Sequence, residues 1–252
     1  MKITAIITCA GKGTRAGFSE NKLRKSLGDV TVAEKTFSVF ENCPFIDDII
    51  ITSNPNDVAF FSQIANKSKK NCMVVLGGNT RTQSVYNALL HVKGDIVLIH
   101  DGARPFITQQ ILENCVKSVK KYGSGITCVP VIDTLALSED GENIRKTARE
   151  GSFAVQTPQG FYTNEILSAY EKVLSSGETF TDDSGIYAKY QKKPHICEGD
   201  SQNVKLTYPK DFDNGLLVGT GFDLHRLVED RKLILGGIEI QHTKSPKRVY
   251  RY

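Results

Sequence analysis

Short apolar runs rich in β-branched residues alternate with stretches of helical period along most of this 252-residue chain. The runs that we expect to be strands are residues 3–9, 48–52, 73–76, 95–99 and 126–131. The stretches that we expect to be helices are residues 32–41, 56–69, 80–91, 108–121 and 164–174. This alternation predicts an α/β fold with a doubly wound, mostly parallel sheet that helices cover on both faces. Such sheets bind ligands at the carboxyl ends of their strands, so functional residues are expected just after each run.

The charge of the chain is small and unevenly distributed. There are 32 basic and 28 acidic residues, which gives a formal net charge of +4. Four of the basic residues and none of the acidic ones lie within residues 241–252, so the first 240 residues are neutral overall. This balance does not favour a nucleic-acid or membrane partner, and we expect neither. With 40% hydrophobic residues, a chain of this length can bury a core without disulfides or structural metals.

Six cysteines are scattered along the chain, and no two of them form a C-x-x-C pair. This usage is typical of reduced, buried thiols, not of a disulfide framework or a metal cage. The apolar run of residues 3–10 is too short to span a membrane. The residues that follow it, Gly11-Lys12-Gly13, do not form a signal-peptide cleavage pattern. We therefore expect a cytoplasmic protein.

A glycine-rich loop follows the first expected strand and reads A-G-K-G-T-R-A-G over residues 10–17. Glycines let the backbone approach a phosphate and direct N–H groups at it. The spacing also fits a dinucleotide fingerprint, but the second expected strand ends near residues 52–54 without the acidic residue that the fingerprint requires. Lys12 and Arg15 suit a triphosphate better than the pyrophosphate of a dinucleotide. A plain strand-to-helix turn is the third interpretation of this loop.

Asn21-Lys22-Leu23 comes shortly after the loop, where a second cation can flank a phosphate. Here the sequence resembles the nucleotidyltransferases of the sugar-nucleotide type, and most of all the 2-C-methyl-D-erythritol 4-phosphate cytidylyltransferase family. That family has a glycine-rich loop with an arginine, followed by Pro-Lys-Gln. This chain keeps the lysine, but it has Asn21 in place of the proline and Leu23 in place of the glutamine.

The resemblance implies a defined fold and reaction. The implied fold is the mixed, mostly parallel sheet of the nucleotide-diphospho-sugar transferases. The implied reaction transfers a cytidylyl group from CTP to 2-C-methyl-D-erythritol 4-phosphate, releases pyrophosphate and uses Mg²⁺. Arg15 and Lys22 would then be the catalytic residues, because cations there can stabilise the charge that develops on the α-phosphate.

Three later blocks extend the resemblance over about residues 2–214. They read G-G-N-T-R-T-Q-S-V at residues 77–85, H-D-G-A-R-P at residues 100–105 and E-G-D-S-Q-N-V-K-L-T at residues 198–207. Taken alone, Thr80 would be a helix cap, and Asp101 with Arg104 would be an ion pair. In the family context, the implied nucleotide-binding residues are Ala10, Gly11, Lys12, Gly13, Gly78, Arg81, Ser84, Asp101 and Lys205.

The acceptor side and a projecting arm are expected in the middle of the chain. Residues 133–151 are polar and contain a turn signal, E-D-G-E-N, at residues 139–143, which predicts a hairpin. In the resembling family, an arm of this kind joins two subunits, so residues 135–148 would be a β-arm of a homodimer. Arg149 would then act across the interface between the subunits. The implied acceptor-binding residues are Arg104, Thr134, Arg149 and Thr157.

The chain changes character after about residue 214. Residues 218–225 (V-G-T-G-F-D-L-H) and 233–238 (L-I-L-G-G-I) resemble the start of the 2-C-methyl-D-erythritol 2,4-cyclodiphosphate synthase family. We therefore expect a cytidylyltransferase domain over residues 1–214 and a truncated second domain with a divergent basic tail over residues 215–252. Asp223 and His225 share one face of an expected strand and suit Zn²⁺, but the third ligand of that family is missing. We expect a vestigial metal site and no cyclase activity.

Three other functions remain open at this point. The chain can be a nucleotidyltransferase for another sugar or alditol phosphate. It can be a non-catalytic nucleotide-binding module, because Asn21 and Leu23 depart from the family pattern. It can also be a dinucleotide-dependent enzyme, as the glycine spacing of the first loop allows.

Overall fold

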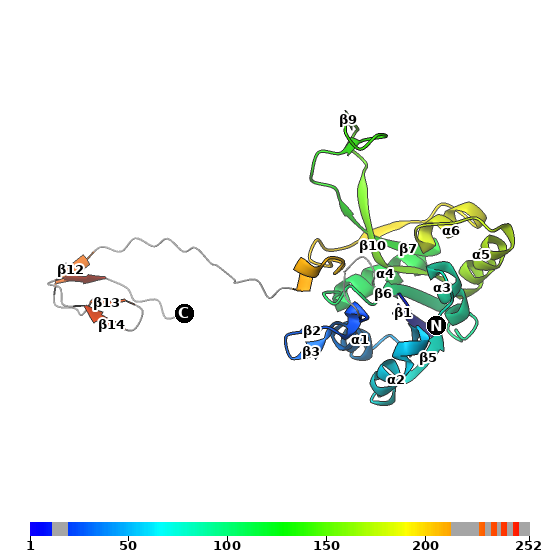
Figure 1. Cartoon of the computed structure of the whole chain (residues 1–252), viewed down its shortest axis with the longest axis horizontal. Helices are drawn as coiled ribbons and strands as arrows, with labels where there is room; N and C mark the ends of the chain where they lie inside the picture. The colour runs from blue at the N-terminus through cyan, green and yellow to red at the C-terminus, as the bar shows by residue number, and fades with distance from the viewer. Residues whose placement is uncertain (12–19, 213–226, 230–232, 236–237, 241–243, 247–252) are drawn as a thin grey trace. The chain divides into compact units, whose positions relative to one another are not determined.

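The computed structural model describes residues 1–11, 20–212, 227–229, 233–235, 238–240 and 244–246 (Figure 1). The chain divides into two compact units, Met1–Asp213 and Asn214–Tyr252. In the second unit, β12 (Leu227–Glu229) pairs with β15 (Lys244–Pro246), and β13 (Leu233–Leu235) pairs with β14 (Ile238–Ile240), both antiparallel. That this unit is the start of another enzyme domain stays a prediction.

A seven-stranded sheet with the order β11-β7-β10-β6-β1-β4-β5 forms the centre of the first unit. Its strands are β1 (Ile3–Thr8), β4 (Asp48–Ser53), β5 (Asn71–Leu76), β6 (Ile96–Asp101), β7 (Ser124–Pro130), β10 (Phe153–Tyr162) and β11 (Ile196–Glu198). β10 is antiparallel to both of its neighbours, and every other adjacent pair in this sheet is parallel. The predicted mixed, mostly parallel sheet is therefore confirmed.

Helices cover both faces of the sheet (Figure 1). One core contains residues of α1 (Val32–Glu41), α2 (Val58–Asn66) and α4 (Gln109–Tyr122). The other contains residues of α3 (Arg81–Leu89), α5 (Thr163–Ser176) and α6 (Asp183–Tyr190). Successive residues of β1 alternate between the two cores, as Ala5 and Ile7 do with Ile6. The inner strands β1, β4 and β6 are buried on both sides, and for this reason they appear in the sequence as continuous apolar runs.

Threonine side chains begin several of the helices. Thr31 and Glu34 form a reciprocal capping box at the start of α1. The hydroxyl of Thr80 accepts from the backbone N–H of Gln83, and that of Thr108 accepts from Ile111, at the starts of α3 and α4. The local interpretation of Thr80 as a cap is therefore confirmed.

The five expected strands and five expected helices are all present, with ends shifted by a few residues. β10, β11 and α6 were not among the predicted elements. β10 carries Pro158 and Gly160, which normally argue against a central strand. The register of β10 against β7 shifts between Val155 and Gln159, so the proline lies at an irregularity where a ladder hydrogen bond is not required. None of the described helices is long and apolar enough to cross a membrane.

Two small hairpins lie outside the main sheet. β2 (Ser26–Leu27) pairs with β3 (Val30–Thr31), shortly after the 3-10 turn η2 (Lys22–Arg24). β8 (Ala136–Leu137) pairs with β9 (Arg145–Lys146), and this hairpin projects from the body of the first unit (Figure 1). Its turn is stabilised by Asp140, whose carboxylate accepts from the backbone of Glu142 and Asn143. The structure thus has the arm that the polar stretch predicts.

The remaining short elements are the 3-10 turns η3 (Pro55–Asp57) and η4 (Pro209–Phe212). All six cysteines of the chain are unpaired, and five of them are buried.

Candidate active site

Three adjacent strands bring the first loop and the aspartate block together at one edge of the sheet. Thr8, the last residue of β1, lies opposite both Thr52 of β4 and Asp101 of β6. Ala10 and Gly11 continue from this point, and a Cβ at Gly77 would lie only 2.4 Å from the Ala10 Cβ atom. Glycine at residue 77 therefore allows the turn before α3 to pack against the first loop. The expected assembly of loops at the carboxyl ends of the strands is present.

A pocket of about 440 Å³ opens at this edge. Five of the predicted site residues line it, namely Arg81, Asp101, Arg104, Thr157 and Lys205. Gln156, Gln159, Asp182 and Ser184 also line it, and none of these four was among the predicted site residues. Its wall combines the end of β6 and the middle of β10 with the start of α6, elements that lie far apart in the chain.

The carboxylate of Asp101 lies among three cations. The Lys205 ammonium is 2.6 Å from its Oδ2 atom, while Arg81 Nε is 3.7 Å from Oδ1 and Arg104 Nε is 3.9 Å from Oδ2. Burial opposes ionisation of Asp101, but the charges of Lys205, Arg81 and Arg104 outweigh it and hold the pKa of this carboxyl well below its usual range. Because Arg81 also pairs with Asp183, Asp101 balances Arg104 and Lys205, and this leaves one positive charge in the cluster for an anionic ligand.

Arg81 is fixed by a second carboxylate. Its Nη1 and Nη2 atoms donate to the two oxygens of Asp183 at 2.8 and 2.7 Å, and Tyr170 donates its hydroxyl to Oδ1 of the same carboxylate. Burial favours the neutral form of Arg81, but Asp183 and Asp101 outweigh it and raise the pKa of the guanidinium. Because Asp183 engages both terminal nitrogens, Arg81 presents its Nε edge toward Asp101.

A chain of hydrogen bonds sets the orientation of the Thr157 hydroxyl. The backbone N–H of Asp101 donates to Thr157 Oγ1 at 3.0 Å, and the same oxygen lies 3.1 Å from His100 Nδ1. His100 Nε2 lies 3.2 Å from the carbonyl oxygen of Arg104, which can only accept, so Nε2 carries the hydrogen. Since the neutral ring has one N–H, Nδ1 accepts the hydroxyl hydrogen of Thr157. Thr157 therefore keeps a lone pair for a ligand hydroxyl and has no hydrogen to offer a phosphate.

Burial of His100 should make folding depend on pH. Burial lowers the pKa of this imidazole to about 4, whereas an unfolded histidine has a pKa of about 6.5. As pH falls from 6.5 toward 4, the unfolded chain takes up the proton first, so the free energy of unfolding should fall by about 3 kcal/mol. Urea denaturation at several pH values should show this loss in the wild type and a smaller one in His100→Gln. The exposed His91→Gln variant is the control. If the free energy of unfolding of His100→Gln fell with pH as steeply as that of the wild type, His100 would not be the source of the pH dependence.

Lys22 lies in η2 and reaches the segment that carries Lys205. Its Nζ atom donates to the backbone oxygen of Leu206 at 2.6 Å. The backbone N–H of Leu206 in turn donates to the carbonyl of Ala103, in the aspartate block. The turn with Lys22, the segment of residues 198–207 and the H-D-G-A-R-P block are therefore joined by hydrogen bonds.

Ser84 and Gly78 stabilise the turn before α3. The Ser84 hydroxyl donates to the carbonyl of Thr80 at 2.8 Å and accepts from the N–H of Gly78 at 3.0 Å. These contacts give Ser84 a structural role in the turn. Its predicted role in binding the nucleotide stays a prediction.

The remaining predicted residues either lie outside the described part of the chain or are exposed on the arm. Lys12, Gly13, Arg15, Asp223 and His225 lie outside the described residues. Thr134 and Arg149 are exposed on the arm, where Arg149 Nη1 donates to the carbonyl of Ile132 at 2.7 Å. The expectation that Arg149 acts across a subunit interface stays a prediction.

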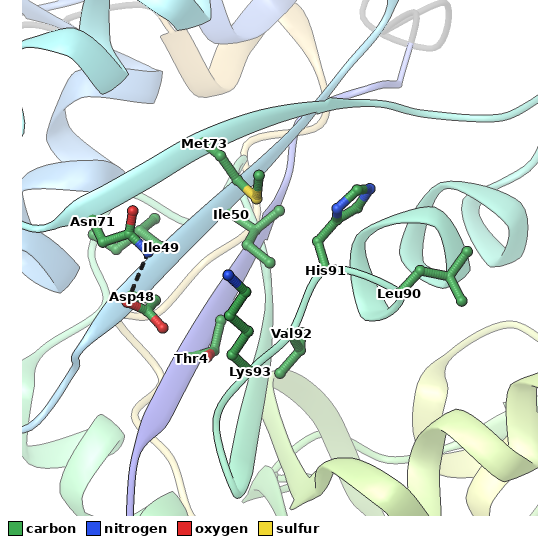
Figure 2. A pocket seen from close by; sticks show the side chains of 10 residues that line it. All are labelled: Thr4, Asp48, Ile49, Ile50, Asn71, Met73, Leu90, His91, Val92 and Lys93. Carbon is green, nitrogen blue, oxygen red and sulfur yellow. Dashed lines mark hydrogen bonds between the residues drawn. The ribbon is translucent and has the colours of Figure 1, made fainter.

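A second pocket, of about 260 Å³, lies at the amino ends of β1, β4 and β5 (Figure 2). None of the predicted site residues that the structure describes lines it. Asp48 within it accepts from the Asn71 amide at 3.0 Å and pairs with Lys2 at 2.7 Å. Since parallel α/β sheets bind ligands at the opposite edge, we take the pocket around Asp101 as the candidate active site.

No cluster of three or more His, Cys, Asp or Glu side chains that could hold a metal occurs in the described part of the chain. A metal at the candidate site would therefore depend on ligand oxygens as well as on Asp101. This is the usual way in which Mg²⁺ is held beside a nucleotide.

Comparison with known proteins gives concordant similarities. A family model described as "IspD: 2-C-methyl-D-erythritol 4-phosphate cytidylyltransferase" matches residues 3–216. A 2-C-methyl-D-erythritol 4-phosphate cytidylyltransferase of Bacillus cereus is 35% identical over 222 residues, which cover 87% of this chain and 96% of that protein. The structure of 4-diphosphocytidyl-2C-methyl-D-erythritol synthase from Anaerococcus prevotii has a TM-score of 0.75 and 30% identity, over 84% of this chain and 92% of that one.

The similarity to one further relative extends beyond the first unit. A protein of Brucella anthropi named "Bifunctional enzyme IspD/IspF" is 33% identical over 261 residues. The match covers 96% of this chain but 64% of that protein. This chain therefore spans less than two thirds of the bifunctional relative.

Proposed function

The chain belongs to the 2-C-methyl-D-erythritol 4-phosphate cytidylyltransferase family, and from this premise we propose the reaction that it catalyses. It transfers a cytidylyl group from CTP to 2-C-methyl-D-erythritol 4-phosphate and releases pyrophosphate. The observation that carries the proposal is the cluster of Arg81, Arg104 and Lys205 around Asp101, at the carboxyl edge of the sheet. A cluster of this kind suits two substrates that both carry phosphates.

The reaction joins two anions, so its barrier is largely electrostatic. An oxygen of the acceptor phosphate forms a bond to the α-phosphorus of CTP, and the bond from that phosphorus to the bridging oxygen of the pyrophosphate breaks. The role of the protein is to position the two phosphates and to stabilise the charge that develops between them. Lys22 and Arg15 are the proposed stabilisers, while Arg104 and Lys205 hold the charged groups on either side.

In this proposal, Thr157 orients the acceptor. Its hydroxyl donates to His100, so it can only accept a hydrogen bond from the ligand. The hydroxyl groups of the methylerythritol chain are suitable donors, whereas its phosphate is not. Arg104, whose Nη1 atom also donates to the carbonyl of Asn203 at 2.7 Å, is the nearby group suited to that phosphate.

Magnesium fits the donor set as an ion carried by the triphosphate. Asp101 is the buried one of two carboxylates that line the pocket, the other being Asp182, and Mg²⁺ in nucleotide sites is held by one or two carboxylates together with phosphate oxygens and water. When bound, it would neutralise charge on the triphosphate. Asp101 is the described residue that would contact it, and the three cations keep this carboxylate ionised.

The direct test is an assay of the purified full chain with CTP and Mg²⁺. Pyrophosphate release and the mass of the product would be measured with 2-C-methyl-D-erythritol 4-phosphate, ribitol 5-phosphate and glycerol 3-phosphate as acceptors, and without any acceptor. We expect release only with the methylerythritol phosphate. If that acceptor were inert and another active, the acceptor assignment would be wrong. If all were inert, the alternative of a non-catalytic nucleotide-binding module would stand.

We also propose that the arm of residues 135–148 joins two copies of the chain, and that Thr134 and Arg149 complete the acceptor site of the partner. The exposure of both residues, away from the pocket of their own chain, supports this arrangement. Sedimentation of the full chain distinguishes a dimer from a monomer. The unpaired cysteines support a cytoplasmic setting for the reaction.

The segment after about residue 216 is proposed to correspond to the start of a cyclodiphosphate synthase domain. The similarity to the bifunctional relative supports this, because it covers 96% of the chain. Asp223 and His225 would be two ligands of a divalent metal such as Zn²⁺ in a complete domain of that kind.

A further inference from the structure

Asn21, which stands where the resembling family has proline, is tied to the loop after β4. It is buried, and its Nδ2 atom donates to Oδ2 of Asp57 at 2.8 Å and to the carbonyl oxygen of Cys9 at 3.3 Å. Asp57 ends the turn η3 and is only 4% exposed. A hydrogen bond between a buried amide and a buried carboxylate is costly to lose, because water cannot readily replace either partner at a buried position.

Asp57 gathers donors from three residues. Besides Asn21, the Asn54 amide donates to Oδ2 at 2.5 Å, and Arg24 Nη1 lies 3.5 Å from Oδ1. Asn54 also accepts from the backbone N–H groups of Asn56 and Asp57, which fixes the turn that carries the carboxylate. Asp57 is therefore a rigid attachment point in the loop between β4 and α2.

The same asparagine closes the turn that contains Lys22. Asn21 Oδ1 accepts from the backbone N–H of Leu23 at 3.1 Å, and its carbonyl oxygen accepts from the N–H of Arg24 at 3.0 Å. The backbone φ of Asn21 is −59°, close to the value that a proline ring imposes. In this chain the side chain supplies by hydrogen bonding the rigidity that a ring would otherwise supply.

We propose that Asp57 is a positioning residue for the transfer reaction, acting through Asn21 to hold the Lys22 turn in place. This inference rests on the proposed function, because it assumes that Lys22 acts on the phosphates. Asp57 itself does not line the pocket around Asp101. Its contribution reaches the reaction through the position of Lys22, so it should disappear when Lys22 is replaced.

The test compares Asp57→Ala in two backgrounds, the wild type and Lys22→Ala, with steady-state kinetics for both substrates. Asp57→Ala alone should lower kcat by about 10–100-fold, the range expected when a catalytic group is misplaced by about an ångström. KM for CTP should stay within about twofold, since an interaction made only in the transition state is affected. In the Lys22→Ala background the same change should cost no further activity. Asn56→Ala is the matched control, because Asn56 is exposed on the same turn.

Two results would overturn the inference. Either kcat of Asp57→Ala equals that of the wild type, or the loss is equally large in the Lys22→Ala background, as a general loss of folding would produce. If the wild type does not transfer cytidylyl groups, the proposed function fails, and hydrogen exchange still tests the anchor. The amides of Leu23 and Arg24 should exchange faster in Asp57→Ala than in the wild type or Asn56→Ala, and equal rates would contradict the anchor.

Discussion

Replacement of Lys22 by alanine is expected to lower kcat by about 10²–10³-fold, the loss typical when one group that stabilises transition-state charge is removed. The ammonium is held near the pocket by its bond to the Leu206 carbonyl, in the segment that carries Lys205. The charge that it would stabilise grows as the acceptor phosphate approaches the α-phosphorus. KM for CTP should therefore change by only about a few-fold, because this contact contributes little to binding of CTP in the ground state.

Steady-state kinetics with CTP varied at saturating acceptor would check the Lys22 prediction. Lys117→Ala is a suitable control, since Lys117 is an exposed lysine on α4 whose partner is Glu113 on the same helix. It should behave as the wild type does. A variant in which KM rises while kcat is unchanged would show that Lys22 binds both states equally and is not catalytic.

The pattern of buried strands made most of the fold predictable. β1, β4 and β6 are apolar on both faces, so they appear in the sequence as short continuous runs between helical stretches. β10 was not predictable in the same way. It has Gln156, Pro158 and Gly160 within ten residues. It forms a strand because it pairs with β6 on one side and β7 on the other, and a register shift against β7 accommodates the proline.

The site was predictable where its residues directly follow a strand. Asp101 ends β6, and the rule for parallel sheets places it beside the end of β1. Arg104 and Lys205 came from the family resemblance, and the structure brings both to the same carboxylate.

The supporting carboxylates could not be predicted from the sequence. Asp183 pairs with an arginine 102 positions away, and Asp57 accepts from an asparagine 36 positions away. No spacing or local composition links such pairs, because they depend on how the loops meet in space. Asp57 in particular appears in the sequence as an ordinary polar residue before a helix. Its role becomes visible only when its burial and its three donors are known.

Asp183→Ala is expected to have the largest effect on stability, a loss of about 3 kcal/mol in the free energy of unfolding. Asp183 is fully buried, and its removal leaves the Arg81 guanidinium and the Tyr170 hydroxyl without their acceptor. Breaking a buried pair typically costs 3–5 kcal/mol, and the lower end applies because the Arg81 side chain is 32% exposed and also lies near Asp101.

Urea denaturation of the single and double variants would measure the contribution of the Asp183–Arg81 pair. Arg81→Ala combined with Asp183→Ala should lose clearly less stability than the two single changes together, because the double variant leaves no uncompensated guanidinium. Glu113→Ala removes an exposed ion pair of similar length on α4, 2.8 Å to Lys117, and should cost less than about 1 kcal/mol. If Asp183→Ala were no more destabilised than Glu113→Ala, the buried carboxylate would not be what holds Arg81 at the pocket. The orientation of its Nε edge toward Asp101 would then need another cause.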